Sequence, residues 1–171
     1  MRRPFGSHVI ENIQFKLSYP AQRHAQTAAE CAVKLHPLLQ GRTEQIEKIV
    51  LTTHQLAYRT INVTGPLPNF AARDHCLQYI AAVGLLHGDI TTESYEDAFA
   101  KNPAIDALRA KMVVEENEQY TKSYADPEVR ANPNAIQVFF KDGTSTPRLE
   151  IEYPIGDPVR RKDGLPVLEQ K

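Results

Sequence analysis

The chain has 171 residues, of which 42% are hydrophobic and 24% are charged, close to the averages of globular domains. This composition excludes a disordered tail, a collagen-like fibre and a disulfide scaffold. Because 20 basic and 21 acidic residues leave a net charge of −1, we expect neither nucleic acid nor an anionic membrane as a partner.

Hydropathy and the two cysteines indicate in which cellular compartment the protein is expected. The sequence has no run of about 18 apolar residues, which a membrane span needs, and its first residues do not form the apolar core of a secretory signal. Cys31 and Cys76 both lie in apolar helical patterns, which favours buried free thiols over a disulfide. We therefore expect a soluble intracellular protein, in the cytoplasm or, in a eukaryote, in the mitochondrial matrix.

The first half of the chain predicts strand, helix and strand. Alternating apolar and polar residues predict a strand over residues 12–17. Ser18 and Pro20 supply a cap and a first-turn proline for an amphipathic helix that ends near Gly41. Dense β-branched residues predict a buried strand over residues 46–53. The phrase NVTGPLPN, with one glycine and two prolines, predicts a loop.

The second half predicts helices followed by strands. A central, almost wholly apolar helix is predicted from Asn69, as its N-cap, to Gly88, and shorter helices over residues 92–101 and 103–111. Strands are predicted over residues 112–120, 135–141 and 148–153. The last two are joined through an Asp-Gly turn and should form an antiparallel hairpin.

This order of elements predicts an α+β fold: a two-layer sandwich with helices on one face of a mixed β-sheet and a C-terminal antiparallel hairpin. Residues 11–155 hold these elements and are predicted to form one small α+β domain. Residues 1–10 are predicted to be a connector from a preceding domain. Residues 156–171 carry too little apolar pattern to pack alone, so we expect a truncated segment there.

His24 is the first candidate functional residue. No Walker loop, GxGxxG, HExxH, GxSxG or paired CxxC motif occurs in the sequence. His24 falls in the first turn of its predicted helix and shares a face with Cys31 and Leu35. The helix dipole there favours a neutral imidazole that can accept a proton. The alternative is a structural histidine whose hydrogen bonds are satisfied.

A second candidate group lies in the phrase RDHCLQY, at the start of the central helix. His75 and Tyr79 are spaced to share one helix face, with Arg73 and Gln78 alongside. An arginine at a helix start can hold a carboxylate through two parallel hydrogen bonds. The alternative is a surface ion pair between Arg73 and Asp74 beside a packed tyrosine.

Lys16 is the third candidate, just before the turn that leads to the His24 helix. Strand ends that lead into helix starts are common ligand positions, although a solvated lysine is the simpler interpretation. The remaining histidines show no metal-ligand spacing and are predicted to be surface or cap residues; they are His8, His36, His54 and His87.

Several long ungapped phrases occur in a specific order: FGSHVIENIQFKLSYPAQRHAQTAAE, TGPLPNFAARDHCLQYIAAVGLLHGDIT, KMVVEENEQYT, and NAIQVFFKDGT followed by EIEYPIG. From about Arg3 to the end, they resemble the C-terminal part of the MmgE/PrpD family. The phrases YPAQRHAQTA, RDHCLQY and IEYPIG are nearer the dehydratase branch of the family than its cis-aconitate decarboxylases.

The resemblance implies a two-domain carbon–oxygen lyase, without metal, iron–sulfur cluster or other cofactor, that assembles as a homodimer. Its reaction would remove water from 2-methylcitrate, a small tricarboxylate, to give 2-methyl-cis-aconitate in propionate catabolism. A helical domain would precede this chain, which would be the small domain that closes over the substrate cleft. Residues 156–171 would be the start of a segment that returns to the helical domain. The resemblance leaves open a decarboxylase-like member of the family or a non-catalytic fragment that acts only as a folded interface domain.

Site residues follow from the resemblance position by position. Lys16 and Tyr79 match a family lysine and a family tyrosine in the cleft, and His24 matches the histidine of the phrase FHAQTA, although Gln22 and Arg23 replace the usual acid and aromatic residue. Proton transfer would involve His24 or Tyr79. The substrate carboxylates would be bound by Lys16, Arg73, His75 and Gln78. Further proton-transfer residues of the family lie in the helical domain, so we expect the isolated chain to be inactive.

Overall fold

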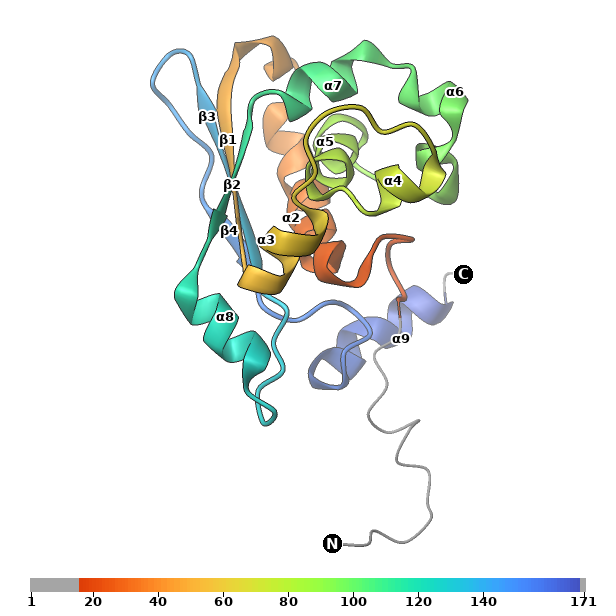
Figure 1. The fold of residues 1–171 in the computed structure, drawn as a ribbon, viewed down its shortest axis with the longest axis vertical. Coiled ribbons are helices and arrows are strands. Elements are labelled where there is room, and N and C mark those ends of the chain that lie inside the picture. The colour runs from red at the N-terminus through yellow and green to blue at the C-terminus, as the bar shows by residue number, and fades with distance from the viewer. Residues whose placement is uncertain (1–15, 170–171) are drawn as a thin grey trace, which may run out of the picture.

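The computed structural model describes residues 16–169 (Figure 1). Its centre is a four-stranded sheet in the order β2-β1-β3-β4. The strands are β1 (Ile46–Thr53), β2 (Met112–Glu116), β3 (Asn134–Phe140) and β4 (Leu149–Ile151). β2 runs parallel to β1, whereas β3 is antiparallel to β1 and β4 is antiparallel to β3. The sheet is therefore mixed, as predicted.

Helices cover one face of this sheet. Figure 1 shows α2, α3 and α5 on the same side of the strands, and α8 beyond the lower end of the sheet. The α-helices are α2 (Gln26–Leu39), α3 (Gln55–Ile61), α4 (Phe70–Asp74), α5 (Leu77–His87), α6 (Asp97–Ala100), α7 (Pro103–Arg109), α8 (Glu118–Ala125) and α9 (Arg161–Glu169). Short 3-10 helices are η1 (Arg23–Ala25), η2 (Thr43–Gln45), η3 (Thr92–Tyr95) and η4 (Pro158–Arg160). The predicted α+β class is confirmed.

The core lies between the sheet and the helix pair α2 and α5. Small residues let these two helices approach closely: a Cβ atom added at Gly84 of α5 would lie 2.7 Å from the Cβ of Ala32 on α2. On the other side, Ile49 and Leu51 of β1 are buried against the helices, and the intervening side chains are less buried. This alternation is why the β-branched run over residues 46–53 forms the strand that was predicted.

The central helix predicted from Asn69 to Gly88 is interrupted, and this part of the prediction is wrong. Asn69 does cap α4, and Gly88 does end α5 in the left-handed conformation at φ 71°. Between them, Cys76 has an extended backbone, and its Sγ accepts the N–H of Tyr79. Cys76 therefore acts as a second N-cap, so α5 begins afresh at Leu77.

Three other elements also differ from the prediction. The strand predicted over residues 112–120 ends at Glu116, because Asn117 caps α8 through a bond from the Tyr120 N–H to its Oδ1 at 3.1 Å. The helix predicted over residues 92–101 is divided into η3 and α6. In the first helix, Gln22 rather than Ser18 supplies the cap, and a 3-10 turn precedes α2.

The two ends of the chain differ in what the structure describes. The connector predicted over residues 1–10, and residues 12–15 of the first predicted strand, lie outside the described residues; Lys16 and Leu17 belong to no regular element. At the other end, η4 and α9 follow the sheet, and Arg160 binds the Glu30 carboxylate of α2 through two nitrogens. Within residues 16–169, no helix is long and apolar enough to cross a membrane.

Candidate functional site

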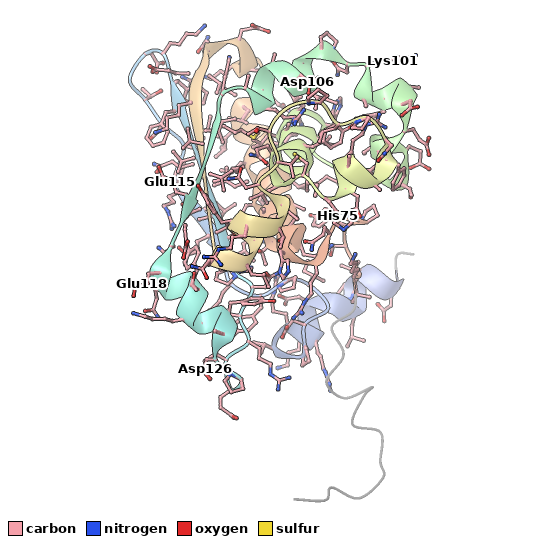
Figure 2. All side chains as sticks on the ribbon, in the orientation of Figure 1. His75, Lys101, Asp106, Glu115, Glu118 and Asp126 are labelled. Carbon is pink, nitrogen blue, oxygen red and sulfur yellow. The ribbon has the colours of Figure 1, made fainter. Side chains whose placement is uncertain are left out.

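The candidate site lies at the carboxyl end of β1, the lower end of the sheet in Figure 1. There β1 leads into α3, β2 leads towards α8, and η1 leads into α2. In Figure 2, the labels of Glu118 and Asp126 mark the two ends of α8. The register pairs Thr53 with Glu116 of β2 and with Asn134 of β3, so three strands are aligned at this edge. Ligands commonly bind outside the carboxyl ends of parallel strands, so this edge is a candidate binding site.

His54 directly follows β1 and is fully buried. Its Nδ1 accepts the N–H of Ala57 at 3.4 Å, which makes His54 the N-cap of α3. The other ring nitrogen, Nε2, therefore carries the proton and donates to Oδ1 of Asn132 at 3.0 Å. Burial, followed by the charge of a protonated His24, lowers the pKa of His54 to about 4. His54 is therefore a neutral imidazole near pH 7.

His24 packs against His54 from the neighbouring 3-10 turn, η1. The two ring centroids are 5.1 Å apart in an edge-on arrangement, and the Tyr124 ring of α8 lies 5.4 Å from His24 on another side. His24 keeps only 8% of its surface exposed, and within residues 16–169 its Nδ1 is enclosed without a hydrogen-bond partner. Burial, followed by the charge of Arg23, lowers the pKa of His24, while a hydrogen bond with Asn132 opposes this shift.

Two asparagines, one just before β3 and one at its first residue, bind the turn that carries His24. Nδ2 of Asn132 donates to the carbonyl oxygen of Arg23 at 2.7 Å, and Nδ2 of Asn134 donates to that of His24 at 2.8 Å. Thr27 joins them, since its hydroxyl donates to the carbonyl oxygen of Asn132 and accepts from Nδ2 of Asn134. These buried bonds connect η1 to the sheet across a long separation in sequence.

The chemistry available here is proton transfer by a neutral imidazole. Because the pKa of His24 is below its ordinary value of 6.5, most of its population is uncharged near pH 7 and carries a free lone pair. Among residues 16–169, the charge of Arg23 acts on His24, and the rings of His54 and Tyr124 pack against it. Within residues 16–169, no group of three or more His, Cys, Asp or Glu side chains could hold a metal ion.

The structure places Arg73 and Tyr79 together, but around η3. The Tyr79 hydroxyl donates to the carbonyl oxygen of Ser94 at 2.6 Å, and Nη1 of Arg73 donates to that of Tyr95 at 2.6 Å. Arg73 also pairs with Asp97 at 2.7 Å, not with Asp74 as the simpler interpretation had it. Tyr79 is buried, and burial raises the pKa of its phenol. Both side chains thus have partners within the domain.

The other predicted site residues lie apart from one another. His75, labelled in Figure 2, is exposed at the end of α4, with its Nδ1 3.1 Å from the carbonyl oxygen of Ala71. Gln78 is buried, donates to Oδ1 of Asn62 at 2.6 Å, and lines a pocket of about 500 Å³. Lys16 is exposed at the start of the described chain. The roles assigned to these residues remain predictions.

Sequence reasoning missed three members of the cluster around His24: His54, Tyr124 and Asn132. His54 was expected to be a surface or cap residue, and it is a cap that is also completely buried. Its position directly after a buried strand could have indicated a site residue, because such positions lie at the carboxyl edge of the sheet. Tyr124 and Asn132 gave no such signal, since their contacts with His54 form only when α8 and β3 pack.

Comparison with known proteins identifies the family. The model of the MmgE/PrpD C-terminal domain matches residues 19–171. The chain is 49% identical to the 2-methylcitrate dehydratase of Salmonella typhimurium and 47% identical to that of Escherichia coli, in both cases over 99% of this chain and 36% of the relative. It is 46% identical to the mitochondrial 2-methylcitrate dehydratase of Yarrowia lipolytica, over 99% of this chain and 33% of the relative.

The chain spans about a third of the length of the relatives it matches. The phrases that suggested the family from the sequence, including YPAQRHAQTA and RDHCLQY, lie almost wholly within the matched residues. The chain belongs to the MmgE/PrpD family and forms its C-terminal domain.

Proposed function

We propose that this chain is the C-terminal domain of a lyase that removes water from 2-methylcitrate to give 2-methyl-cis-aconitate. The observation that carries the proposal is the identity of 46–49%, over almost the whole chain, to proteins named 2-methylcitrate dehydratases in two bacteria and a yeast. In this proposal, the domain closes over a substrate cleft that it shares with the rest of the enzyme. The enzyme is a homodimer that serves propionate catabolism.

The reaction has requirements that this domain meets only in part. Elimination of water needs a base beside a carboxylate, an acid for the leaving hydroxyl, and cations that bind three carboxylates. His24 is the candidate proton-transfer group, because it is mostly neutral near pH 7 and lies at the carboxyl edge of β1. Lys16 is the candidate carboxylate-binding cation, because it is exposed on the segment that leads into η1.

The remaining catalytic groups belong, in this proposal, to the other two thirds of the enzyme. Arg73 and Tyr79 support the fold from within, because both bind carbonyl oxygens of η3. The isolated chain should therefore bind substrate weakly and not turn it over.

A chimeric enzyme tests the proposal. This chain would replace the matching third of the Salmonella typhimurium relative, and dehydration of 2-methylcitrate would be followed by the ultraviolet absorbance of the new double bond. Citrate and cis-aconitate would be assayed in parallel, with release of carbon dioxide from cis-aconitate as a separate readout. The isolated chain serves as the second sample.

We expect the chimera to dehydrate 2-methylcitrate with a higher kcat/KM than citrate, and the isolated chain to have no turnover. A folded chimera that decarboxylates cis-aconitate and leaves 2-methylcitrate unchanged would replace the proposed reaction with that of another branch of the family. A folded chimera without either activity would favour a domain that serves only as an interface.

A further inference from the structure

We propose that Asn132, acting with His54, is the positioning residue of His24: its side-chain amide fixes both the backbone turn and the ring contacts that hold this imidazole at the carboxyl edge of β1. The inference rests on the proposed function in one respect, which is that His24 takes part in proton transfer. The geometry that carries it lies wholly within this chain.

Asn132 supports the backbone of η1. A 3-10 turn of three residues has little stability of its own, so bonds from the rest of the fold help to hold it. The carbonyl oxygen of Arg23 accepts the N–H of Gln26 within the turn, and Asn132 adds a second bond to the same oxygen, at 2.7 Å. Its own backbone is fixed in turn, because its N–H donates to the carbonyl oxygen of Glu152 and its carbonyl oxygen accepts from the Thr27 hydroxyl. Asn132 is thus a rigid support for the turn that carries His24.

The Asn132 amide has a fixed orientation. Its Nδ2 donates to the carbonyl oxygen of Arg23. Its Oδ1 therefore faces His54, and the Nε2 of His54 donates to this oxygen at 3.0 Å. His54 cannot rotate away, because its Nδ1 caps α3 and its ring stacks on Tyr124. Asn132 therefore fixes the His54 ring, and His54 stacks on Tyr124. These two rings pack edge-on against His24.

The side chain at position 132 is uncharged. Position 132 accepts a hydrogen bond from an imidazole and also donates one to a carbonyl oxygen, and an amide does both without carrying charge. An aspartate has nearly the same shape, but its carboxylate would lie beside both imidazoles. An opposite charge within about 4–6 Å raises the pKa of a histidine. Compared with an aspartate at this position, the amide therefore favours the neutral form of His24 while it fixes the ring.

Asn132→Asp tests the inference directly. Nuclear magnetic resonance of this chain would follow the titration of the His24 ring protons and their shift from the Tyr124 ring current. In the unsubstituted chain we expect His24 to titrate below its ordinary pKa of 6.5, and in Asn132→Asp above it. The matched control is Asn102→Asp, which adds the same charge at the partly exposed N-cap of α7 and should leave the His24 titration unchanged.

Asn132→Ser is a second variant, which adds no charge and cannot reach both partners. It should abolish the ring-current shift of His24, because the turn and the His54 ring lose their common support. This variant decides the question if Asn132→Asp does not fold. The inference is overturned if His24 still titrates below 6.5 in folded Asn132→Asp, or if its ring-current shift survives in Asn132→Ser.

The chimeric enzyme separates this inference from the proposed function. There, Asn132→Asp should move the acidic limb of the kcat profile to higher pH, together with the pKa measured for His24. A substitution that only destabilised the fold would lower the melting temperature and leave that limb in place, which would contradict a positioning role. A chimera without activity would count against the proposed function, whereas the titration of His24 in the chain alone would still decide the positioning inference.

Discussion

The imidazole of His54 lies flat against the phenol ring of Tyr124, with the ring centroids 4.1 Å apart and the planes 7° from parallel. The first residue caps α3 and the second lies in the last turn of α8, so this contact joins the elements that follow β1 and β2. Together with His24, the two rings form one aromatic cluster at the carboxyl edge of the sheet. The stability of this edge should therefore depend on the charge of its histidines.

The folded chain should lose stability in mild acid. The pKa of His54 is about 4 in the folded state, whereas its ordinary value is 6.5. Between these two pH values, His54 is protonated in the unfolded chain but stays neutral in the folded chain. The free energy of unfolding should fall between pH 6.5 and about 4, by on the order of 3 kcal/mol from this group, and then level off. Urea unfolding at a series of pH values measures this decline.

His54→Gln is the matched variant for this measurement, because its amide can still donate to Asn132. It should be less stable at pH 7 and show a shallower decline in acid. A pH dependence as steep in His54→Gln as in the unsubstituted chain would show that other groups cause the loss.

Tyr79→Phe should affect stability and leave chemistry intact. Its hydroxyl is the partner of the buried carbonyl oxygen of Ser94, and an acceptor left without its donor costs about 1–3 kcal/mol. In the chimera, kcat should stay within about twofold while the melting temperature falls. If kcat falls by two or more orders of magnitude at an unchanged melting temperature, the role in proton transfer expected from the family resemblance is correct instead.

Arg160→Ala should loosen the C-terminal helices from α2. Arg160 binds the Glu30 carboxylate with Nη1 at 2.8 Å and Nη2 at 3.1 Å, and also donates to the carbonyl oxygen of Tyr153. Burial would raise the pKa of Glu30, but hydrogen bonds from Arg160 and Lys34 lower it overall. Removing one partner of a buried carboxylate costs about 1–3 kcal/mol when a second remains.

Hydrogen exchange of α9 measures this loosening. The amides of α9 should exchange faster in Arg160→Ala, while those of β1 stay protected. Lys162→Ala, an exposed cation of the same helix, is the control. Equal exchange in the two variants would mean that the pair with Glu30 does not anchor these helices.

Strongly periodic segments were predicted well from the sequence, and segments that depend on a side-chain cap were not. The run IEKIVLTT forms β1 at the predicted residues because its β-branched side chains alternate between core and partial exposure. Cys76 and Asn117 each start a helix through a side-chain bond to the backbone, and neither pattern was recognised as a cap. A cysteine cap in an apolar run is hard to distinguish from an ordinary core cysteine.

In the candidate site, the sequence predicted His24 as a functional residue but did not predict the residues that pack around it. His24 was singled out from its position near a helix start, and the structure does place it beside ionisable and aromatic groups. His54 and Asn132 come from distant parts of the chain, so their contact with η1 depends on the antiparallel register of β1 and β3. The register between two distant strands cannot be read from the residue pattern of either segment alone.

Lys16→Ala tests carboxylate binding in the chimera. If Lys16 neutralises a carboxylate in both the ground state and the transition state, its loss should raise KM by one to two orders of magnitude, about 1.4–2.8 kcal/mol, with little change in kcat. Steady-state kinetics over a wide range of 2-methylcitrate concentrations separates the two constants. Lys101→Ala, on the opposite side of the domain from the candidate site (Figure 2), is the control. An unchanged KM would show that Lys16 is only a solvated surface lysine.

The most direct measurement is the kcat of the chimera carrying His24→Gln, with 2-methylcitrate as substrate. If His24 transfers a proton in the reaction, kcat should fall about 100-fold or more while KM stays nearly constant, because the lost interaction belongs to the transition state. His87→Gln, which changes an exposed histidine of α5, should leave both constants unchanged. An intact kcat in His24→Gln, with only a lower melting temperature, would contradict this account and make His24 a structural histidine.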